Sequence, residues 1–172
     1  FTNLMFGGGS IIAQPTGYVN HAENRKYVRY PFGVIEKHEK TLEGLETQPY
    51  VGVVYAYESP EAHVQTGWLT GTTNARTSTR GAFSAFLYNH VQVSSVSEFV
   101  LDDPAKLSEY PILYLANIPY LSEERIENII DYVAQGGCLI GSYATTIFNA
   151  EGNKQSSFGL ENLFKVRPVI PK

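Results

Sequence analysis

The sequence predicts an α/β fold in which helices cover an open, mostly parallel β-sheet. Two apolar runs, YVGVVYAY at 50–57 and PILYLANI at 111–118, have the length and the β-branched and aromatic content of strands buried on both faces. A third short run, CLIGSY at 138–143, has the same character. Helical patterns separate these runs, so the strands are joined by crossover connections, which make neighbouring strands parallel.

The first 48 residues differ in character from the rest of the chain. Residues 3–6 form a short apolar run that ends in Gly7, Gly8, Gly9 and Ser10, a pattern typical of a strand that enters an open loop. Pro31 opens a stretch, PFGVIEKHEKTLEGL, whose apolar residues fall near helical spacing, and proline is accepted in a first helical turn. We therefore expect a strand–loop–helix unit over 1–48 and a second domain over 49–172.

The second domain begins with the strand at 50–57, and a polar segment follows it. Residues 59–78 are rich in Gly and Thr, and this length predicts a loop that is either functional or partly disordered rather than a short connection. Residues 80–91 have one apolar face and predict a helix that Ser78 or Thr79 caps. Residues 93–101 alternate between apolar and polar side chains, as in a strand near a sheet edge.

A second helix has clear start and stop signals. Ser122 provides a hydroxyl cap, two glutamates follow it, and Gly136 with Gly137 provides a left-handed end. Its apolar face is expected to contain Ile126, Ile129, Ile130 and Val133. The strand after it, 138–143, is predicted to be the third buried strand, with the sheet covered on both faces.

Composition excludes several classes of protein. The 172 residues are 43% hydrophobic and carry a net charge of −4, with no cluster of Lys and Arg, so neither nucleic acid nor a membrane is an expected partner. The chain starts at Phe1 in apparent mid-strand, so we expect it to be a piece of a longer protein whose signals, if any, lie upstream. The compartment is therefore not predicted. An aromatic content of 13% favours packing at interfaces and leaves stacking on sugars as an alternative.

No constellation in the sequence predicts a metal, a cofactor or a catalytic group. The four histidines lie far apart and form no ligand pair, and the single cysteine, Cys138, is expected in the core. Ser142 follows a glycine at a strand end, but Ala144 stands where a nucleophile elbow needs glycine, and no histidine follows. Glu58 is the carboxylate best placed at a carboxyl strand end. The side chains expected around that cleft are Glu58, His63, Trp68, Ser142 and Tyr143.

The region from Arg80 to Val166 resembles the β-galactosidase trimerisation domain, which is built on the class I glutamine amidotransferase fold. SYATTIFNAEG at 142–152 resembles the strand-to-hairpin element of that family, and FGLENLF at 158–164 resembles the motif that follows it. Asn149 and Asn162 stand where the family has acids, which leaves the packing role of Phe158, Leu160, Leu163 and Phe164 intact. The resemblance implies a flavodoxin-like three-layer sandwich, with 1–48 as the last unit of a (β/α)8 barrel.

The resemblance also implies a function. In glutamine amidotransferases a cysteine lies at the turn after this third strand, whereas Cys138 lies at the start of the strand and no histidine follows it. The implied role is therefore a non-catalytic domain that assembles a glycoside hydrolase and shapes its active site, with the barrel and a homo-oligomer as partners. Aromatic side chains would make those contacts: Tyr55, Tyr57, Trp68, Tyr120 and Tyr143. The alternative is a stand-alone enzyme or a module that binds carbohydrate in the cleft.

Overall fold

The computed structural model describes residues 22–44, 48–56 and 72–167 of the chain. The chain divides into two compact units, Phe1–Gln48 and Pro49–Lys172. In the first unit, helix α2 spans Ala22–Leu42. The sequence prediction of a helix that starts at Pro31 was therefore wrong, because AENRKYVRY ahead of it contains strong helix formers and the helix continues through the proline. The strand and glycine run predicted at 3–10 lie outside the described residues.

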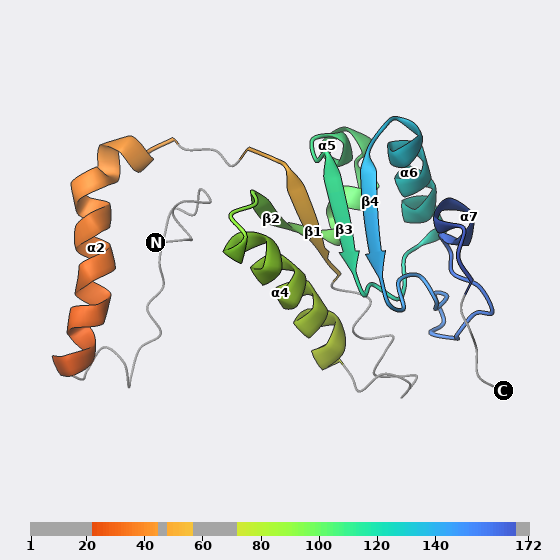
Figure 1. The fold of residues 1–172 in the computed structure, drawn as a ribbon, viewed down its shortest axis with the longest axis horizontal. Coiled ribbons are helices and arrows are strands. Elements are labelled where there is room, and N and C mark those ends of the chain that lie inside the picture. Colours follow the sequence, from red (N-terminus) through yellow and green to blue (C-terminus); the bar gives the residue numbers. More distant parts are fainter. Residues whose placement is uncertain (1–21, 45–47, 57–71, 168–172) are drawn as a thin grey trace. The chain divides into compact units, whose positions relative to one another are not determined.

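The second unit contains a parallel β-sheet, as predicted. In its described part the sheet has four strands in the order β2-β1-β3-β4. They are β1 (Val51–Tyr55), β2 (Val93–Ser97), β3 (Ile112–Ala116) and β4 (Cys138–Ser142). Every adjacent pair is parallel, so β2 and β4 are the edges and the direction of winding reverses between β1 and β3 (Figure 1).

Helices lie on the two faces of this sheet (Figure 1). Helix α4 (Thr72–Tyr88) packs on one face, against β1, β2 and β3. Helices α5 (Pro104–Ser108), α6 (Glu123–Ala134) and α7 (Glu161–Phe164) lie on the other side, together with the 3-10 helix η1 (Glu98–Asp102). None of the described helices is long and apolar enough to span a membrane.

Two predicted boundaries need correction, and one helix was missed. Helix α4 begins at Thr72 rather than Arg80, so Ser78 and Thr79 lie inside it and do not cap it. Strand β2 ends at Ser97 rather than Leu101, because the Ser97 hydroxyl accepts a hydrogen bond from the Phe99 amide and starts the 3-10 helix. Helix α5 was not predicted, although Asp103 followed by Pro104 is a cap followed by a favoured first residue.

The core contains two large apolar clusters, one on each face of the sheet, and a smaller third cluster of Ala144, Ile147 and Phe148. Leu113 and Leu115 of β3 belong to the cluster under α6 with Leu101, Leu107, Ile118 and Ile129. Val51 and Val53 of β1 belong to the cluster under α4 with Ala82, Val93 and Ala116. Each fully buried Val, Leu or Ile side chain stabilises the fold by about 1.5–3 kcal/mol. The two large clusters together therefore fix the sheet between its helices.

A buried ion-pair network holds α6 against η1. Arg125 is 6% exposed and its guanidinium donates to both carboxylate oxygens of Asp102, at 2.6 and 2.9 Å, and to Glu98 at 3.2 Å. The guanidinium also lies 5.6 Å from the centre of the Phe99 ring. Its hydrogen bonds lower the pKa of the Asp102 carboxyl below its ordinary value. Sequence reasoning missed this network, because charged residues are rarely expected in a core.

The predicted ends of helix α6 are confirmed, but only part of its predicted buried face is. The Ser122 hydroxyl accepts from the Arg125 amide at 3.3 Å, and Gly136 ends the helix with a φ of 104°. Ile129 is fully buried, whereas Ile130, predicted on the same face, is 40% exposed. Tyr132 is buried instead of Ile130. The buried face of the helix therefore contains Arg125, Ile129 and Tyr132, and it is rotated slightly about the helix axis from the predicted face.

Candidate functional site

The carboxyl end of β4 is the place where a nucleophile would stand if this fold carried one. Ser142 ends the strand and is half-buried, and Tyr143 follows with a φ of 54° and 70% exposure. The left-handed residue of this turn is therefore a tyrosine rather than a cysteine or serine. Among the predicted cleft residues, the structure brings these two together by chain adjacency, while Glu58, His63 and Trp68 lie outside the described residues.

Two threonines fill the space beyond this strand end. The Thr145 hydroxyl lies 3.1 Å from the Leu115 carbonyl and 2.8 Å from that of Ser142. The Thr146 hydroxyl accepts from the Leu160 amide at 3.3 Å, and the Thr146 amide donates to the Ile118 carbonyl at 2.7 Å. Both threonines are buried. Their hydrogen bonds tie β3, β4 and the segment before α7 together, which is a structural role rather than a chemical one.

A cavity of about 240 Å³ lies next to these residues, and its lining includes Ser142, Tyr143, Phe158 and Phe164. No histidine, carboxylate or cysteine is among its lining residues, so none of the described side chains that line it is a general base for Ser142. Within the described part of the chain, no group of three or more His, Cys, Asp or Glu could hold a metal ion.

One polar side chain is buried at the reversal point of the sheet. Asn117 follows β3 with a φ of 57° and is 3% exposed. Its Oδ1 has no hydrogen-bond partner, alone among the buried side-chain polar atoms of the described residues. Ligands of open α/β sheets bind at such reversal points, so Asn117 is the described side chain best placed to accept a hydrogen bond from a ligand there.

Among the predicted strands, β4 differs most from its prediction. It was expected to be a buried strand, and this expectation was wrong. Cys138 is exposed, Ile140 is 36% exposed, and no residue of the strand is fully buried. The register pairs Ile112 with Cys138 and Tyr114 with Ile140, so all four side chains point to the face that α4 covers. Helix α4 extends over β3, where Phe86 meets Tyr114 at a ring-centre distance of 6.2 Å, but it does not cover β4.

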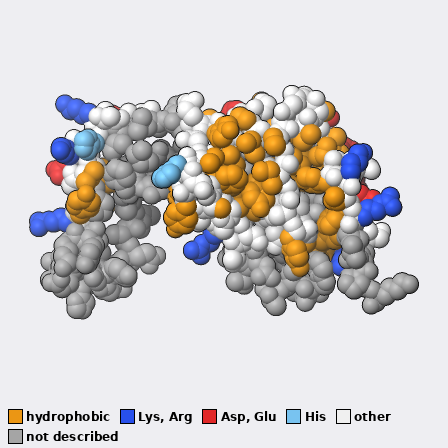
Figure 2. Space-filling model, in the orientation of Figure 1, with side chains coloured by type: hydrophobic (Ala, Val, Ile, Leu, Met, Phe, Trp, Pro, Cys, Tyr) orange, Lys and Arg blue, Asp and Glu red, His pale blue; other side chains and the backbone are white. Residues whose placement is uncertain are grey.

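We call the side chains of Cys138 and Ile140, with the backbone edge beside them that no other described strand pairs with, the open face of β4. Figure 2 shows hydrophobic side chains gathered over this part of the sheet beside α4. The opposite face of β4 is covered, because Leu139 packs in the cluster under α6 and the Phe164 ring lies against Gly141. The strand is thus closed on one side and bare on the other.

The open face also lacks charge. No Asp, Glu, Lys, Arg or His occurs between Val133 and Ala150, nor between Tyr110 and Ser122. Exposed edge strands usually carry charged residues or prolines that prevent pairing with other chains. An edge without charge, next to exposed apolar side chains, has the properties of a contact surface.

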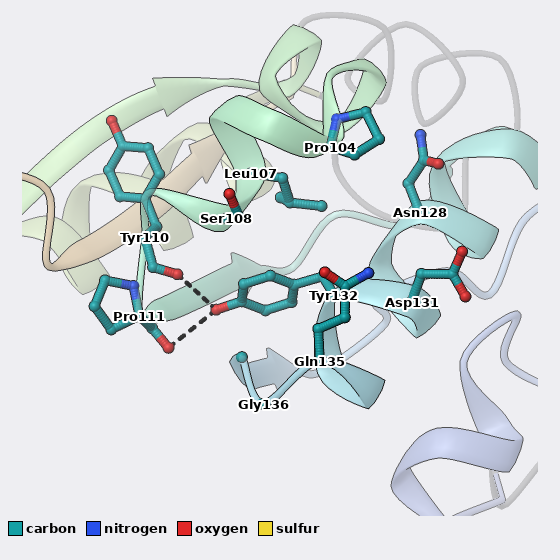
Figure 3. Close-up of a pocket in the computed structure, with 11 residues that line it drawn as sticks. Pro104, Leu107, Ser108, Tyr110, Pro111, Asn128, Asp131, Tyr132, Gln135 and Gly136 are labelled. Carbon is teal, nitrogen blue, oxygen red and sulfur yellow. Dashed lines mark hydrogen bonds between the residues drawn. The ribbon is translucent and has the colours of Figure 1, made fainter.

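A second cavity, of about 300 Å³, lies at the other end of the sheet, between α5 and α6 (Figure 3). The Tyr132 hydroxyl lies within 2.9, 3.0 and 3.2 Å of the carbonyl oxygens of Tyr110, Pro111 and Cys138. Burial is the main cause that raises the pKa of the Tyr132 phenol to about 12. This hydroxyl fixes the starts of β3 and β4 to the end of α6.

Comparison with known families identifies the domain. The model of the β-galactosidase trimerisation domain matches residues 50–165, which is more than half of the chain. The chain belongs to this family. The motifs at 142–152 and 158–164 predicted this family. No curated protein sequence matches the chain.

Two solved structures have a similar fold. Gan42B, a GH42 β-galactosidase, aligns with a TM-score of 0.69 and 20% identity over 95% of this chain and 24% of its own. A β-galactosidase from Bifidobacterium adolescentis aligns with a TM-score of 0.56 and 21% identity over 68% of this chain and 54% of its own. The chain thus spans about half of one relative and a quarter of the other.

Proposed function

We propose that this chain is a non-catalytic assembly domain of a glycoside hydrolase. In this proposal residues 1–48 are the last unit of a (β/α)8 barrel, residues 49–172 are a flavodoxin-like domain, and the active site lies in the barrel. The division of the chain after Gln48 supports the domain boundary. The strand order β2-β1-β3-β4 supports the flavodoxin-like arrangement, which shares this order.

The observation that carries the proposal is the open face of β4. Parallel sheets occur almost only where both of their faces are covered, yet Ile140 is 36% exposed at an uncharged edge. Coverage by a neighbouring copy would bury this apolar surface and stabilise an oligomer, at about 25 cal/mol for each Å² removed from water. Tyr143, at 70% exposure beside the same strand, would extend the contact.

The proposed domain acts by geometry rather than by chemistry. The carboxyl end of β4, where related folds carry a nucleophile, is occupied by Tyr143 and by the buried pair Thr145 and Thr146. Those hydrogen bonds hold the strand end rigid. A rigid domain at a rotational interface would fix the position of the barrel, and with it the shape of the sugar pocket.

The test compares two isoleucines of similar exposure. Ile140 is 36% exposed on β4 and Ile130 is 40% exposed on α6, so Ile140→Asp and Ile130→Asp remove similar apolar surface and add the same charge. Light scattering should show that Ile140→Asp lowers the solution mass, while Ile130→Asp leaves it unchanged. An equal mass for both variants and the unchanged protein would contradict assembly through this face.

The alternative is an enzyme or a carbohydrate-binding module that uses the carboxyl ends of the strands. The unpaired Oδ1 of Asn117 at the reversal point favours it. Under this alternative, Glu58→Gln abolishes turnover of an aryl glycoside and leaves the solution mass unchanged. Under the assembly proposal, the chain alone turns over no aryl glycoside, and Glu58→Gln leaves the turnover of the full-length protein intact.

A further inference from the structure

The cavity between α5 and α6 is separate from the open face and from the carboxyl ends of the strands. Its lining comes from α5, from the segment before β3, and from the second half of α6 and the residues that follow it. Figure 3 shows the α6 residues Asn128 and Asp131 on one side, Tyr110 and Pro111 on the other, and Tyr132 between them. A volume of about 300 Å³ is at the lower end of the range for small-molecule sites.

The inner part of this cavity is apolar and rigid. Leu107 is 1% exposed and Tyr132 is 7% exposed. The Tyr132 hydroxyl is held among three backbone carbonyls, and the absence of a side chain at Gly137 leaves the space that its ring occupies. A Cβ at Gly137 would overlap that ring. The cavity therefore keeps its shape without a ligand, and little conformational entropy is lost when one binds.

The rim of the cavity is polar and rich in acceptors. The Asn128 amide nitrogen donates to the Leu101 carbonyl at 2.9 Å, so its Oδ1 is the atom left to accept a hydrogen bond. Asp131 and Gln135, on the same helix, add a carboxylate and an amide. No Lys, Arg or His lines the cavity. This set of groups disfavours phosphate and carboxylate ligands and favours a ligand with several hydroxyl donors.

We propose that this cavity binds a small uncharged sugar or polyol, with its hydroxyls on the acceptors of Asn128, Asp131 and Gln135 and its C–H surface on Tyr110 and Pro111, which are more exposed than Leu107 and Tyr132 behind them. An apolar surface with a few polar groups is typical of such sites. The site would be a binding site without chemistry, at the end of the sheet opposite the carboxyl strand ends. The inference is independent of assembly through β4.

The test is a two-dimensional amide NMR titration of the chain with D-galactose. Binding at an open cavity of this size predicts saturable shifts at 104–111 and 131–137, with a dissociation constant on the order of 1–10 mM. Asp131→Ala should weaken binding about tenfold. Glu127→Ala is the matched control, because it removes the same charge from α6 one turn earlier, at an exposed residue that does not line the cavity.

Three results would overturn the proposal. The first is the absence of saturable shifts in those segments. The second is equal affinity in Asp131→Ala and Glu127→Ala. The third is binding of galactose 6-phosphate as tight as that of galactose, because the lining without cations predicts that the dianion binds more weakly. Since neither variant touches β4, the solution mass of both should equal that of the unchanged protein, which separates this proposal from the assembly proposal.

Discussion

Strands β1 and β4 have five residues each and similar apolar sequences, VGVVY and CLIGS, yet their burial is opposite. Val51, Val53 and Val54 of β1 are fully buried, whereas no residue of β4 is. The difference follows from position in the sheet. β1 lies between two strands and under α4, while β4 has one neighbour and α4 does not cover it. An apolar run therefore predicts a strand whose faces must be buried. It does not predict which helix, strand or partner buries them.

The prediction with the largest expected effect places the same charge on both strands. Val53→Asp buries a carboxylate in a fully buried position of β1 and should destabilise the fold by at least about 4 kcal/mol. Ile140→Asp places it on the open face and should change the free energy of unfolding by about 1 kcal/mol or less. Urea unfolding of the two variants measures both values. Equal losses of stability would mean that β4 is as enclosed as β1.

The covered side of the sheet depends on the Arg125 network, and the next prediction removes its cation. Arg125→Ala leaves Glu98, which is fully buried, without its arginine and should cost about 3–5 kcal/mol of folding stability. The control is Arg167→Ala. Its pair with Glu161 is at 2.7 Å but the Arg167 side chain is 86% exposed, so its loss should cost below about 1 kcal/mol. Similar costs in urea unfolding would show that the network is not buried.

Two glycines, one against the Tyr132 ring and one on helix α4, test the packing around Tyr132. Gly137→Ala forces a methyl group onto the Tyr132 ring and should destabilise the fold by about 1–3 kcal/mol. Gly81→Ala, in helix α4 with open space around its Cβ, should stabilise it by up to about 1 kcal/mol. Thermal unfolding monitored by circular dichroism would show shifts of opposite sign, and shifts of the same sign would contradict the packing around Tyr132.

The last prediction depends on pH. The pKa of the Tyr132 phenol is raised from 10.0 to about 12 in the folded chain, so the folded state holds this proton more tightly than the unfolded state. Its contribution to stability is full below pH 10 and is lost between pH 10 and about 12. Tyr132→Phe should cost about 1 kcal/mol at neutral pH and show a smaller alkaline loss. Urea midpoints on both sides of pH 10 measure the difference, and parallel curves would contradict it.

Much of the fold could be predicted because local signals agreed with the final structure. The cap at Ser122, the left-handed end at Gly136 and the apolar run of β3 each specify their own element. The pairing of the buried Arg125 and Glu98 with the exposed Asp102 could not be predicted in this way, since it joins residues far apart in the sequence.

The surroundings of the candidate site were less predictable, because they also depend on contacts between residues far apart in the sequence. The sequence pointed to Ser142 and Tyr143 at the end of β4, and the structure places them there. Thr145 and Thr146 fill the space beyond that strand end. Two adjacent threonines after a strand end are the sequence signal that could have predicted this packing. Cys138 was expected in the core because free cysteine is usually buried, and only the sheet order explains its exposure.

The most direct test of the central claim is the alkylation rate of Cys138, the single cysteine of the chain, across a range of protein concentrations. The account predicts rapid alkylation in the dilute monomer and slow alkylation once the oligomer forms, because the open face is then covered. Ile140→Asp should keep the rapid rate at all concentrations. An equally rapid rate in the monomer and in the assembled protein would contradict assembly through this face.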